Sequence, residues 1–370
     1  MHVGYSIGPQ NPDDRWVDAD VLERELRLLD LAVELGFESV WTVEHHFTEY
    51  LLSPDPLQLL GWLGARHPRI RLGTGVIVLP WHQPVRCAEQ IAMLDNLSGG
   101  RLVIGLGRGI SRVEYDGFGV DMHSSRERFV AYARAILEGL EKGWIEADDE
   151  FVRVPRRELR PRPRFSLRGR VYAGAMSPEA MPLMARLGIG LLVIPQKPWA
   201  VVRQDHDAYL RTWRETHGAD LAPPAPMCGG MTFVDHDPGR ARAHAERYIA
   251  AYYHSVMKHY AFQAHAHDGV RGYEFYASIS KHIDKRGADA AALEYVNLMP
   301  WGTPEQVLEK LAALRDLIAP AAFNPCFSYG AMPIADAEAS LSLFAREVLP
   351  VLKAWESEPL AKAAPLAPPR

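Results

Sequence analysis

The chain has 370 residues, a formal charge of −5 and 48% hydrophobic residues, enough for one barrel-sized domain or two smaller ones. The negative balance argues against a nucleic-acid partner, which favours a basic surface. The cysteines, at positions 87, 228 and 326, stand far apart, which excludes a disulfide scaffold and a thiolate zinc site. No apolar run approaches the roughly 20 residues that span a bilayer, and no export leader is visible. We therefore expect a cytoplasmic globular protein with no membrane partner.

Short apolar runs alternate with longer segments of helical periodicity along most of the chain. In the segment 21–36, for example, the apolar residues fall on one stripe, and the pattern stops at Gly36. In chain order, the predicted elements are a strand at 2–8, a helix at 21–36, a strand at 38–43, a helix at 56–67, a strand at 69–79, a helix at 84–98, a strand at 101–107, a helix at 124–143, a strand at 171–175, a helix starting at 177–180, a strand at 190–194, a helix around 199–217, a strand near 227–234, a helix at 303–317, a strand at 321–329 and a helix over about 335–355.

Eight strand-plus-helix units in this length predict an α/β fold, a (β/α)8 TIM barrel with insertions. A doubly wound open sheet is the alternative, and it usually shows GxGxxG after its first strand. The nearest match, GLGRG at 105–109, follows the fourth predicted strand instead, and Ile110 stands where the third glycine belongs. We therefore predict a single barrel domain over residues 1–356.

Two segments interrupt the pattern and one follows it. Residues 144–170 are rich in Arg and Pro, which predicts a solvated excursion from the barrel; a phosphate-binding or partner surface is the less favoured interpretation. Residues 254–297 hold many aromatic and polar groups without clear periodicity, which predicts a long loop region of the kind that covers functional sites. The Pro/Ala-rich tail, 357–370, is predicted to be disordered.

Polar motifs stand where several predicted strands end. Glu44-His45-His46 closes the second strand, Arg108 follows the fourth, and Ser177 follows the fifth. A barrel gathers the carboxyl ends of its strands at one face, where its chemistry takes place. These motifs are therefore expected to share one cleft.

The adjacent residues His45 and His46 allow a metal, an acid–base or a packing interpretation. Neighbouring residues on a strand point to opposite faces, so both could not easily bind one ion. The only HxH motif, formed by His265 and His267, lies in the irregular late segment, and we expect no metal site. We favour one histidine facing the cleft and one turned to a neighbouring element, with Glu44 orienting an imidazole for acid–base work near neutral pH.

Arg108 and Ser177 suggest a seat for a phosphate. Arg108 lies between two glycines, which let a ligand approach the backbone, and a guanidinium suits bidentate phosphate recognition. Ser177-Pro178 predicts a helix start, where amide donors favour an anion. The alternatives are an arginine paired with a barrel carboxylate and a simple helix cap. On adjacent strand ends the two residues would hold a monophosphate, which suggests a phosphorylated aromatic cofactor.

Several motifs resemble the bacterial luciferase family of flavin-dependent monooxygenases, in its alkanal monooxygenase branch. They are EHHFTEY at 44–50, VLPWHQPVRCAEQIAMLDNLSGGRLVIGLGRG at 78–109, FGVDMHSSRERF at 118–129, GWIEADDEF at 143–151, VDHDPGRA at 234–241 and WGTPEQV at 301–307. The resemblance runs from the N-terminus to about residue 355. It implies a (β/α)8 barrel that takes reduced FMN from a separate flavin reductase. Dioxygen then adds to the flavin, and the resulting peroxyflavin oxygenates a small organic substrate.

Position by position, the resemblance implies roles for single residues. His45 matches the catalytic histidine, an acid–base group, and Glu44 lies against the flavin pocket. Gly75 and Val76 match a pair that lies against the isoalloxazine and often carries a non-prolyl cis peptide. The other cofactor-binding positions are the phosphate arginine Arg108 with Gly107 beside it, Ile110 near the ring, and Met176 and Ser177 in the phosphate loop.

Three positions depart from the family pattern. Gly107 stands where luciferase has a reactive cysteine, and Ala180 replaces a second phosphate-loop hydroxyl. The aromatic residue expected after the sixth strand falls near Pro195. A long-chain aldehyde substrate and light emission are therefore not implied for this chain.

Two other functions stay open at this point. One is a deazaflavin-dependent oxidoreductase that transfers hydride without dioxygen, and the other is a non-catalytic flavin-binding member of the family. The intact motifs around His45 and Arg108 argue against the second. We also expect a homodimer in which the apolar helices at 56–67 and 84–98 pair across the interface, with His46 or Glu89 near it.

Overall fold

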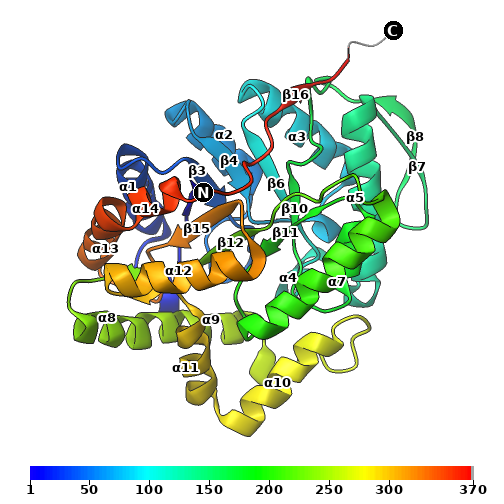
Figure 1. Ribbon diagram of the computed structural model, residues 1–370. Helices are drawn as coiled ribbons and strands as arrows, with labels where there is room; N and C mark the ends of the chain where they lie inside the picture. Colours follow the sequence, from blue (N-terminus) through cyan, green and yellow to red (C-terminus); the bar gives the residue numbers. More distant parts are fainter. Residues whose placement is uncertain (368–370) are drawn as a thin grey trace.

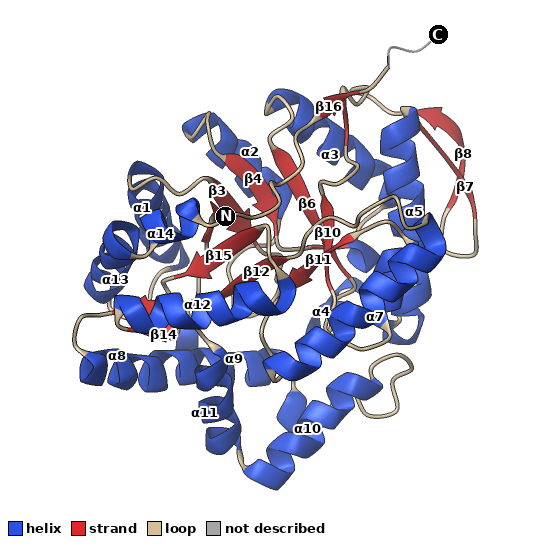
Figure 2. Ribbon diagram, viewed as in Figure 1, coloured by secondary structure: helices blue, strands red, loops and turns tan. Residues whose placement is uncertain are grey.

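The computed structural model describes residues 1–367, which contain a closed barrel of eight parallel strands (Figure 1, Figure 2). The first strand is divided at Gly4 into β1 and β2; β1 pairs with β15 and β2 pairs with β3, which closes the ring. Around the barrel, the strands are β1 (His2–Val3) with β2 (Tyr5–Ser6), β3 (Ser39–Thr42), β4 (Arg71–Thr74), β6 (Leu102–Gly107), β10 (Val171–Gly174), β11 (Gly190–Val193), β12 (Met227–Met231) and β15 (Ala322–Cys326). The short β5 (Ile77–Val78) also pairs with β6. The predicted TIM barrel is confirmed.

Helices cover the outside of the barrel because each one buries an apolar stripe against the strands. Three of them begin at a residue whose side chain accepts a backbone N–H of the first turn, namely Asp55, Gln83 and Thr303. The covering helices are α1 (Asp18–Glu34), α2 (Pro56–Arg66), α3 (Pro84–Leu97), α5 (Ser125–Lys142), α6 (Ala180–Arg186), α7 (Trp199–His217), α12 (Pro304–Ile318), α13 (Ile334–Glu347) and α14 (Leu349–Ala354), and α4 (Arg112–Phe118) follows β6. The short α4 was not predicted, and the last predicted helix is divided into α13 and α14.

Two large aromatic rings fill the barrel interior opposite glycines. A Cβ on Gly73 would lie 2.4 Å from the indole of Trp41, and a Cβ on Gly190 would lie 2.7 Å from the ring of Tyr172. A side chain at either position would clash at those distances, so the rings fit only because both positions are glycine. Trp41 also lines the open space at the carboxyl ends of the strands, so the indole forms part of the floor of that space.

The first insertion is a β-hairpin. Its strands β7 (Trp144–Asp148) and β8 (Arg153–Glu158) pair antiparallel, and β9 (Phe165–Ser166) follows. The arginines of β8 are exposed, and the guanidinium of Arg156 lies 4.3 Å from the ring centre of Trp144. The segment 144–170, predicted as a solvated excursion, therefore contains a regular β-hairpin with an exposed strand β8.

The second insertion is mostly helical, so the prediction of a long loop over 254–297 is wrong. Its elements are α8 (Pro238–His244), the π-helical turn η4 (Ala245–Ile249), α9 (Ala250–His259), η5 (Phe262–Ala264), α10 (Glu274–Arg286) and α11 (Ala288–Leu298). Within α10 the buried residues Tyr276, Ser280 and Ile283 do recur at helical spacing. Figure 1 shows α10 and α11 projecting beyond α9 at one side of the barrel. The short strands β13 (Phe233–Val234) and β14 (Trp301–Gly302) pair at the two ends of the insertion.

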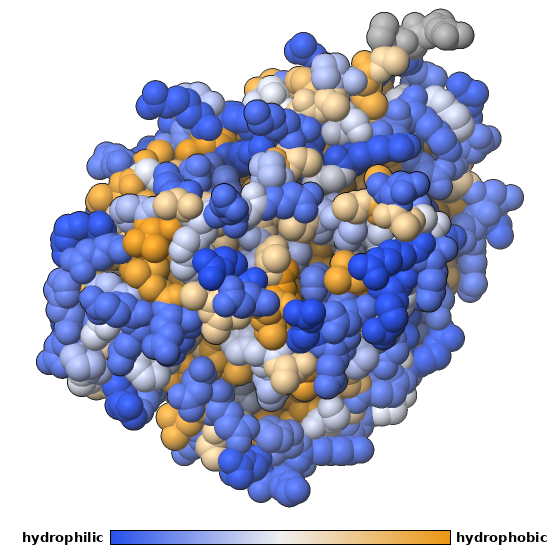
Figure 3. Space-filling view, viewed as in Figure 1, coloured by the Kyte–Doolittle hydropathy of each residue, from blue (hydrophilic) through white to orange (hydrophobic). Residues whose placement is uncertain are grey.

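The tail is also placed against the barrel. Leu360 is buried, Arg71 donates hydrogen bonds to the carbonyls of residues 360 and 361, and β16 (Ala364–Pro365) pairs with β9. The prediction of disorder is therefore wrong for residues 357–367, and residues 368–370 lie outside the described part. Figure 3 shows a largely hydrophilic face with scattered apolar patches. No helix among residues 1–367 is long and apolar enough to cross a bilayer.

Helix α1 carries a buried carboxyl group, Glu25, whose side chain points toward the barrel mouth. It is 3% exposed and accepts a hydrogen bond from the N–H of Gly8 at 3.3 Å. Burial raises the pKa of Glu25 to about 7, and hydrogen bonds from Ser328 and Gly8 only partly oppose it. Between pH 4.5 and about 7, the carboxyl group of Glu25 therefore keeps a proton in the folded protein that it has lost in the unfolded chain.

We predict that Glu25 makes the folded state less stable as the pH rises. Its contribution is fully present below pH 4.5, the ordinary value, and is lost as the pH rises through about 7. At about 1.4 kcal/mol per pKa unit, the loss is on the order of 3 kcal/mol. The variant Glu25→Gln should flatten the pH dependence of urea unfolding between pH 5 and 8, and the exposed control Glu23→Gln should not. An unchanged slope in Glu25→Gln contradicts the assignment.

Candidate active site

A cavity of about 200 Å³ opens at the carboxyl ends of β3, β4, β6 and β10. A second cavity of about 120 Å³ adjoins it over the barrel mouth and shares with it the residues Val43, Leu51, Gly75, Ile194 and Tyr252. All the predicted site residues line the first cavity, namely Glu44, His45, Gly75, Val76, Gly107, Arg108, Ile110, Met176 and Ser177. The predicted residues at the strand ends thus lie around one cavity, as expected from the gathering of those ends at one face of the barrel.

The two adjacent histidines point in different directions. His45 lines the cavity, and its Nδ1 lies 3.2 Å from Glu114 Oε1. The ring of His46 turns away to Glu44 and packs edge-on against Trp81 and Phe118. One histidine thus faces the cavity and the other a neighbouring element, as expected.

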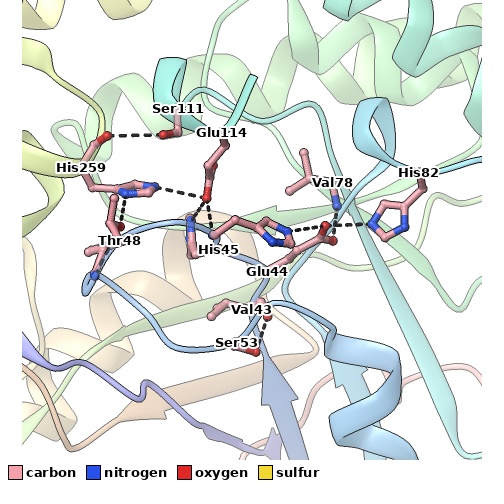
Figure 4. A network of polar contacts seen from close by, with 12 residues as sticks. Val43, Glu44, His45, Thr48, Ser53, Val78, His82, Ser111, Glu114 and His259 are labelled. Carbon is pink, nitrogen blue, oxygen red and sulfur yellow. Dashed lines mark hydrogen bonds and ion pairs between the residues drawn. The ribbon is translucent and has the colours of Figure 1, made fainter. Parts of the chain in front are cut away.

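The carboxylate of Glu44 is buried and forms no hydrogen bond with the imidazole of His45. Its Oε2 accepts the N–H of Val78 at 2.8 Å, and its Oε1 lies 2.8 Å from His82 Nε2 and 3.2 Å from His46 Nε2 (Figure 4). Burial works to raise the pKa of Glu44, but these three partners outweigh it and hold the pKa below its ordinary value. The expectation that Glu44 orients the cavity-facing imidazole is wrong, because its carboxylate is fully used elsewhere.

The carboxylate beside His45 is Glu114, on α4. It also accepts the backbone N–H of His46 at 2.8 Å, and His259 Nε2 lies 3.4 Å from it (Figure 4). Burial opposes ionisation, but the nearby imidazoles of His259 and His45 lower the pKa of Glu114 to about 2. Glu114 and His259 were not among the predicted site residues. Glu114 follows the fourth strand end closely and could have been found there, whereas His259 lies in an insertion with no such signal.

The other end of the cavity carries two guanidinium groups. Arg108 donates to the carbonyl of Gly272 at 2.9 Å, and Arg126 donates to the same oxygen at 3.2 Å. Arg108 also lies over the ring of Tyr273, 3.9 Å from its centre. Arg108, Arg126 and Ser177 all line this cavity. The predicted anion seat therefore includes a second arginine, Arg126, which was not predicted.

Ser177 is not a helix cap. Helix α6 begins at Ala180, its N-cap residue is Glu179, and no side chain caps it. Ser177 is buried in the turn before the helix, where its carbonyl accepts the N–H of Ala180 at 3.0 Å. Its hydroxyl is therefore not used as a cap, and an anion there would rest on side chains more than on a helix terminus.

The cavity wall opposite the arginines is built from small residues. The peptide bond between Gly75 and Val76 is cis, as the resemblance implied, and both residues line the cavity. A Cβ on Gly107 would lie 2.3 Å from a methyl group of Val76, which accounts for glycine at this position. Near Pro195 the second cavity takes its aromatic lining from Tyr252 and Tyr295.

The HxH motif does not form a metal site. The ring of His267 is buried, and its Nε2 donates to the carbonyl of Ile110 at 2.7 Å. His265 turns outward and pairs with Asp268 at 3.1 Å and Asp284 at 3.0 Å. The two imidazoles therefore serve separate contacts.

These features, a parallel barrel with an imidazole and an anion seat at one mouth, agree with the comparison to known proteins. The chain matches the luciferase-like monooxygenase family over residues 1–320. It belongs to this family. The alkanal monooxygenase alpha chain of Photorhabdus luminescens is 28% identical over 341 residues, 90% of this chain and 93% of that protein. The oxygenase component of the flavin-dependent trigonelline monooxygenase of Acinetobacter baylyi is 29% identical over 197 residues, 53% of this chain and 54% of that one.

Solved structures share the barrel. Monooxygenase RslO1 from Streptomyces bottropensis has a TM-score of 0.72 at 25% identity and covers 95% of this chain and 100% of its own. The oxygenating constituent of 3,6-diketocamphane monooxygenase from Pseudomonas putida, in complex with FMN, has a TM-score of 0.71 at 16% identity, covering 95% and 98%. An F420-dependent secondary alcohol dehydrogenase has a TM-score of 0.67 at 14% identity, covering 95% and 99%. The last two show the fold alone, and the family makes this protein a flavin-dependent monooxygenase.

A largely buried lysine, Lys197, supports the loop of this luciferase-like monooxygenase that carries Met176 and Ser177. Lys197 donates to the carbonyl of Met176 at 2.7 Å and forms an ion pair with Asp205 of α7. Both side chains are largely buried. Lys197 thus ties the loop after β10 to the loop after β11 and holds the backbone next to Ser177 in place.

We predict that Lys197→Met weakens the binding of FMN and leaves that of riboflavin, which has no phosphate, unchanged. Without this hydrogen bond the backbone beside Ser177 is less firmly held, so FMN affinity should fall several-fold, whereas riboflavin has no phosphate to be held there. Fluorescence titration with both flavins measures this. The exposed control Lys142→Met should bind both flavins as the unchanged protein does. An equal loss for both flavins would show that Lys197 supports the fold in general.

Proposed function

We propose that this protein is the oxygenase component of a two-component, FMN-dependent monooxygenase. It would receive reduced FMN from a separate reductase and transfer one atom of dioxygen to a small organic substrate. Bound reduced FMN would supply the electrons that activate dioxygen. The observation that carries the proposal is one cavity that is lined both by two guanidinium groups and by a carboxylate-held imidazole.

The residues present fit FMN. The guanidinium groups of Arg108 and Arg126 and the hydroxyl of Ser177 suit a phosphate, which accepts charge-assisted hydrogen bonds. Gly75 presents backbone to the cavity, which a flat ring can approach. Together the two adjoining cavities reach the lower end of the range of ligand sites, roughly 300–1,000 Å³.

In this proposal the imidazole of His45 accepts and returns the proton at the reacting centre. With its Nδ1–H donated to Glu114, the lone pair of Nε2 is free to accept a proton. Glu114 fixes that tautomer and would stabilise the imidazolium that forms, as the carboxylate of a catalytic triad does. The ring is further held edge-on by Tyr50 and His259, with ring centres 4.8 and 5.0 Å away.

A deazaflavin-dependent hydride transfer is the alternative that the fold leaves open, since the F420-dependent dehydrogenase has a similar barrel. Anaerobic turnover with a reduced deazaflavin would select it. A flavin-binding protein without activity is less well supported, because Glu114 commits a buried carboxylate to the cavity-facing imidazole. Uptake of dioxygen after mixing with reduced FMN, accelerated by a substrate, tests the proposal directly.

Arg108→Ala should weaken the binding of reduced FMN at least about tenfold, because one charge-assisted phosphate contact contributes about 1.5–3 kcal/mol. Anaerobic titration of reduced FMN measures the change. Arg112, half-exposed and paired with Asp116 on the surface, provides the matched control Arg112→Ala, which should bind normally. Unchanged affinity in Arg108→Ala removes the phosphate assignment.

His45→Ala should retain flavin binding but uncouple dioxygen consumption from product. The oxygen consumed should then appear as hydrogen peroxide, because the proton required for transfer to the substrate is no longer delivered. Glu114→Gln should lose coupling in the same direction but less completely, since it keeps the imidazole. His236→Ala, at an exposed position, is the control. A fully coupled His45→Ala variant contradicts the role given to this residue.

We also propose a homodimer formed through α2 and α3. Their exposed apolar residues are Trp62, Met93 and Leu97, at 49%, 54% and 74% exposure, and such residues on contacting helices mark an interface. Glu89 accepts a hydrogen bond from the N–H of Arg160, which places it at the hairpin side of α3. The double variant Met93→Glu with Leu97→Glu should be a monomer by light scattering where the unchanged protein is a dimer. A monomeric unchanged protein overturns the proposal.

A further inference from the structure

Three side chains that could ligate a metal meet beside the cavity. His45 follows β3, Glu114 lies on α4, and His259 ends α9, so the chain brings them together from three segments (Figure 4). One ligand atom of each lies within 4.8 Å of the others. The side chains of Glu114 and His259 are each 1% exposed, and that of His45 is 14% exposed toward the cavity.

We propose that His45, Glu114 and His259 form a site for a divalent transition-metal ion of the zinc class, and that its occupancy inhibits the enzyme. The binding site itself rests only on the geometry of these residues. The inhibition rests on the proposed function, because an ion bound to the imidazole of His45 removes it from acid–base work.

The spacing of the ligand atoms suits such an ion. Glu114 Oε1 lies 3.2 Å from His45 Nδ1 and 3.4 Å from His259 Nε2. With bonds of about 2.0–2.2 Å to nitrogen and oxygen, those separations correspond to angles of about 95–115° at the ion, close to tetrahedral. The ligand nitrogens of the two imidazoles are less close, within 4.8 Å, so one ring must rotate to bring its nitrogen into the third position. The cavity that His45 lines leaves a fourth position for water or an added ligand.

The charge of the cluster favours a cation. The carboxylate of Glu114 is buried, and among the described residues no lysine or arginine pairs with it. The ionisable side chains that lie beside Glu114 are the imidazoles of His45 and His259, and an imidazole binds a metal in its neutral form. A buried anion without a full positive partner is costly, and an ion at the cluster offsets that cost.

His259 is prepared for ligation by a neighbour. Thr48 Oγ1 lies 2.8 Å from His259 Nδ1, and a contact of this kind to the second nitrogen typically orients a metal-binding imidazole. The opposite nitrogen, Nε2, is buried, faces Glu114 and makes no hydrogen bond to a described residue. A simple carboxylate–imidazole network without an ion is the competing interpretation, and it predicts no metal binding.

An ion can reach the cluster from two sides. His45 and Glu114 line the 200 Å³ cavity, whereas His259 and Thr48 line a separate groove of about 790 Å³. Tyr50 lines both spaces and packs against both imidazoles, with ring centres 4.8 and 4.6 Å away. The cluster therefore lies in the wall between the cavity and the groove.

The test uses flavin-free, chelator-treated full-length protein titrated with Co²⁺ by visible absorption and with Zn²⁺ by calorimetry. We expect one ion per chain, with the intense visible bands of four-coordinate Co²⁺. His259→Gln should abolish the bands and weaken Zn²⁺ binding by more than the roughly 10–100-fold that loss of an outer partner costs. Thr48→Val, which keeps all three ligands, should fall within that 10–100-fold range. His265→Gln, from the exposed HxH position, should bind as the unchanged protein does.

Absence of binding to the unchanged protein, or unaltered binding in both His259→Gln and Thr48→Val, overturns the site. A loss of binding in His265→Gln would move it to the HxH segment and overturns it equally. Because these titrations contain no flavin, they do not depend on the oxygenase assignment. In turnover, Zn²⁺ should inhibit the unchanged enzyme reversibly on chelation, and the Zn²⁺ concentration for half inhibition should rise in Thr48→Val. Equal sensitivity of the two proteins would contradict inhibition through this cluster.

Discussion

The site depends on two buried carboxylates that are held by donors from different segments. The side chains of Glu44 and Glu114 are each 1% exposed, and burial of an ionised carboxylate is costly unless its oxygens are satisfied. Glu44 joins the end of β3 to the N–H of Val78 and to His82, and Glu114 joins α4 to the backbone of His46. The segment that carries His45 is therefore fixed on both sides, and the direction of its imidazole follows from these contacts.

The fold leaves room for a flat ligand at the barrel mouth. Trp41 and Tyr172 fill the interior because glycines stand opposite them, and the indole of Trp41 borders the second cavity from below. At the mouth, Gly75 presents backbone to the cavity, and the space beside Gly107 is taken up by a methyl group of Val76. Large side chains thus fill the barrel beneath the cavity, and at Gly75 a planar ring can approach the backbone of its wall.

The barrel and the strand-end residues could be predicted because both follow from local patterns. Buried strands alternating with amphipathic helices specify the barrel, and its topology then places His45, Arg108 and Ser177 at one face. Site residues that do not follow a barrel strand were not predicted. Arg126 lies on the helix α5, and His259 ends the helix α9 of the second insertion. The pairing of His45 with Glu114 instead of Glu44 could not be predicted either, because it depends on how far one loop turns after β3.

The second insertion contributes to the proposed anion seat. Its Gly272 carbonyl accepts hydrogen bonds from both Arg108 and Arg126, and Tyr273 stacks on the first and donates to the carbonyl of Gly109. Arg126 also lies 4.0 Å from the carboxylate of Glu179, whereas Arg108 forms no ion pair with a described residue, so a phosphate would neutralise chiefly the charge of Arg108. His45 and Arg108 follow β3 and β6, which are separated only by β4, so strand spacing puts their backbones about 10 Å apart. A ligand with an anion at one end and a reacting ring at the other, joined by a short chain, matches that separation, so the order of the strands is consistent with the proposed FMN.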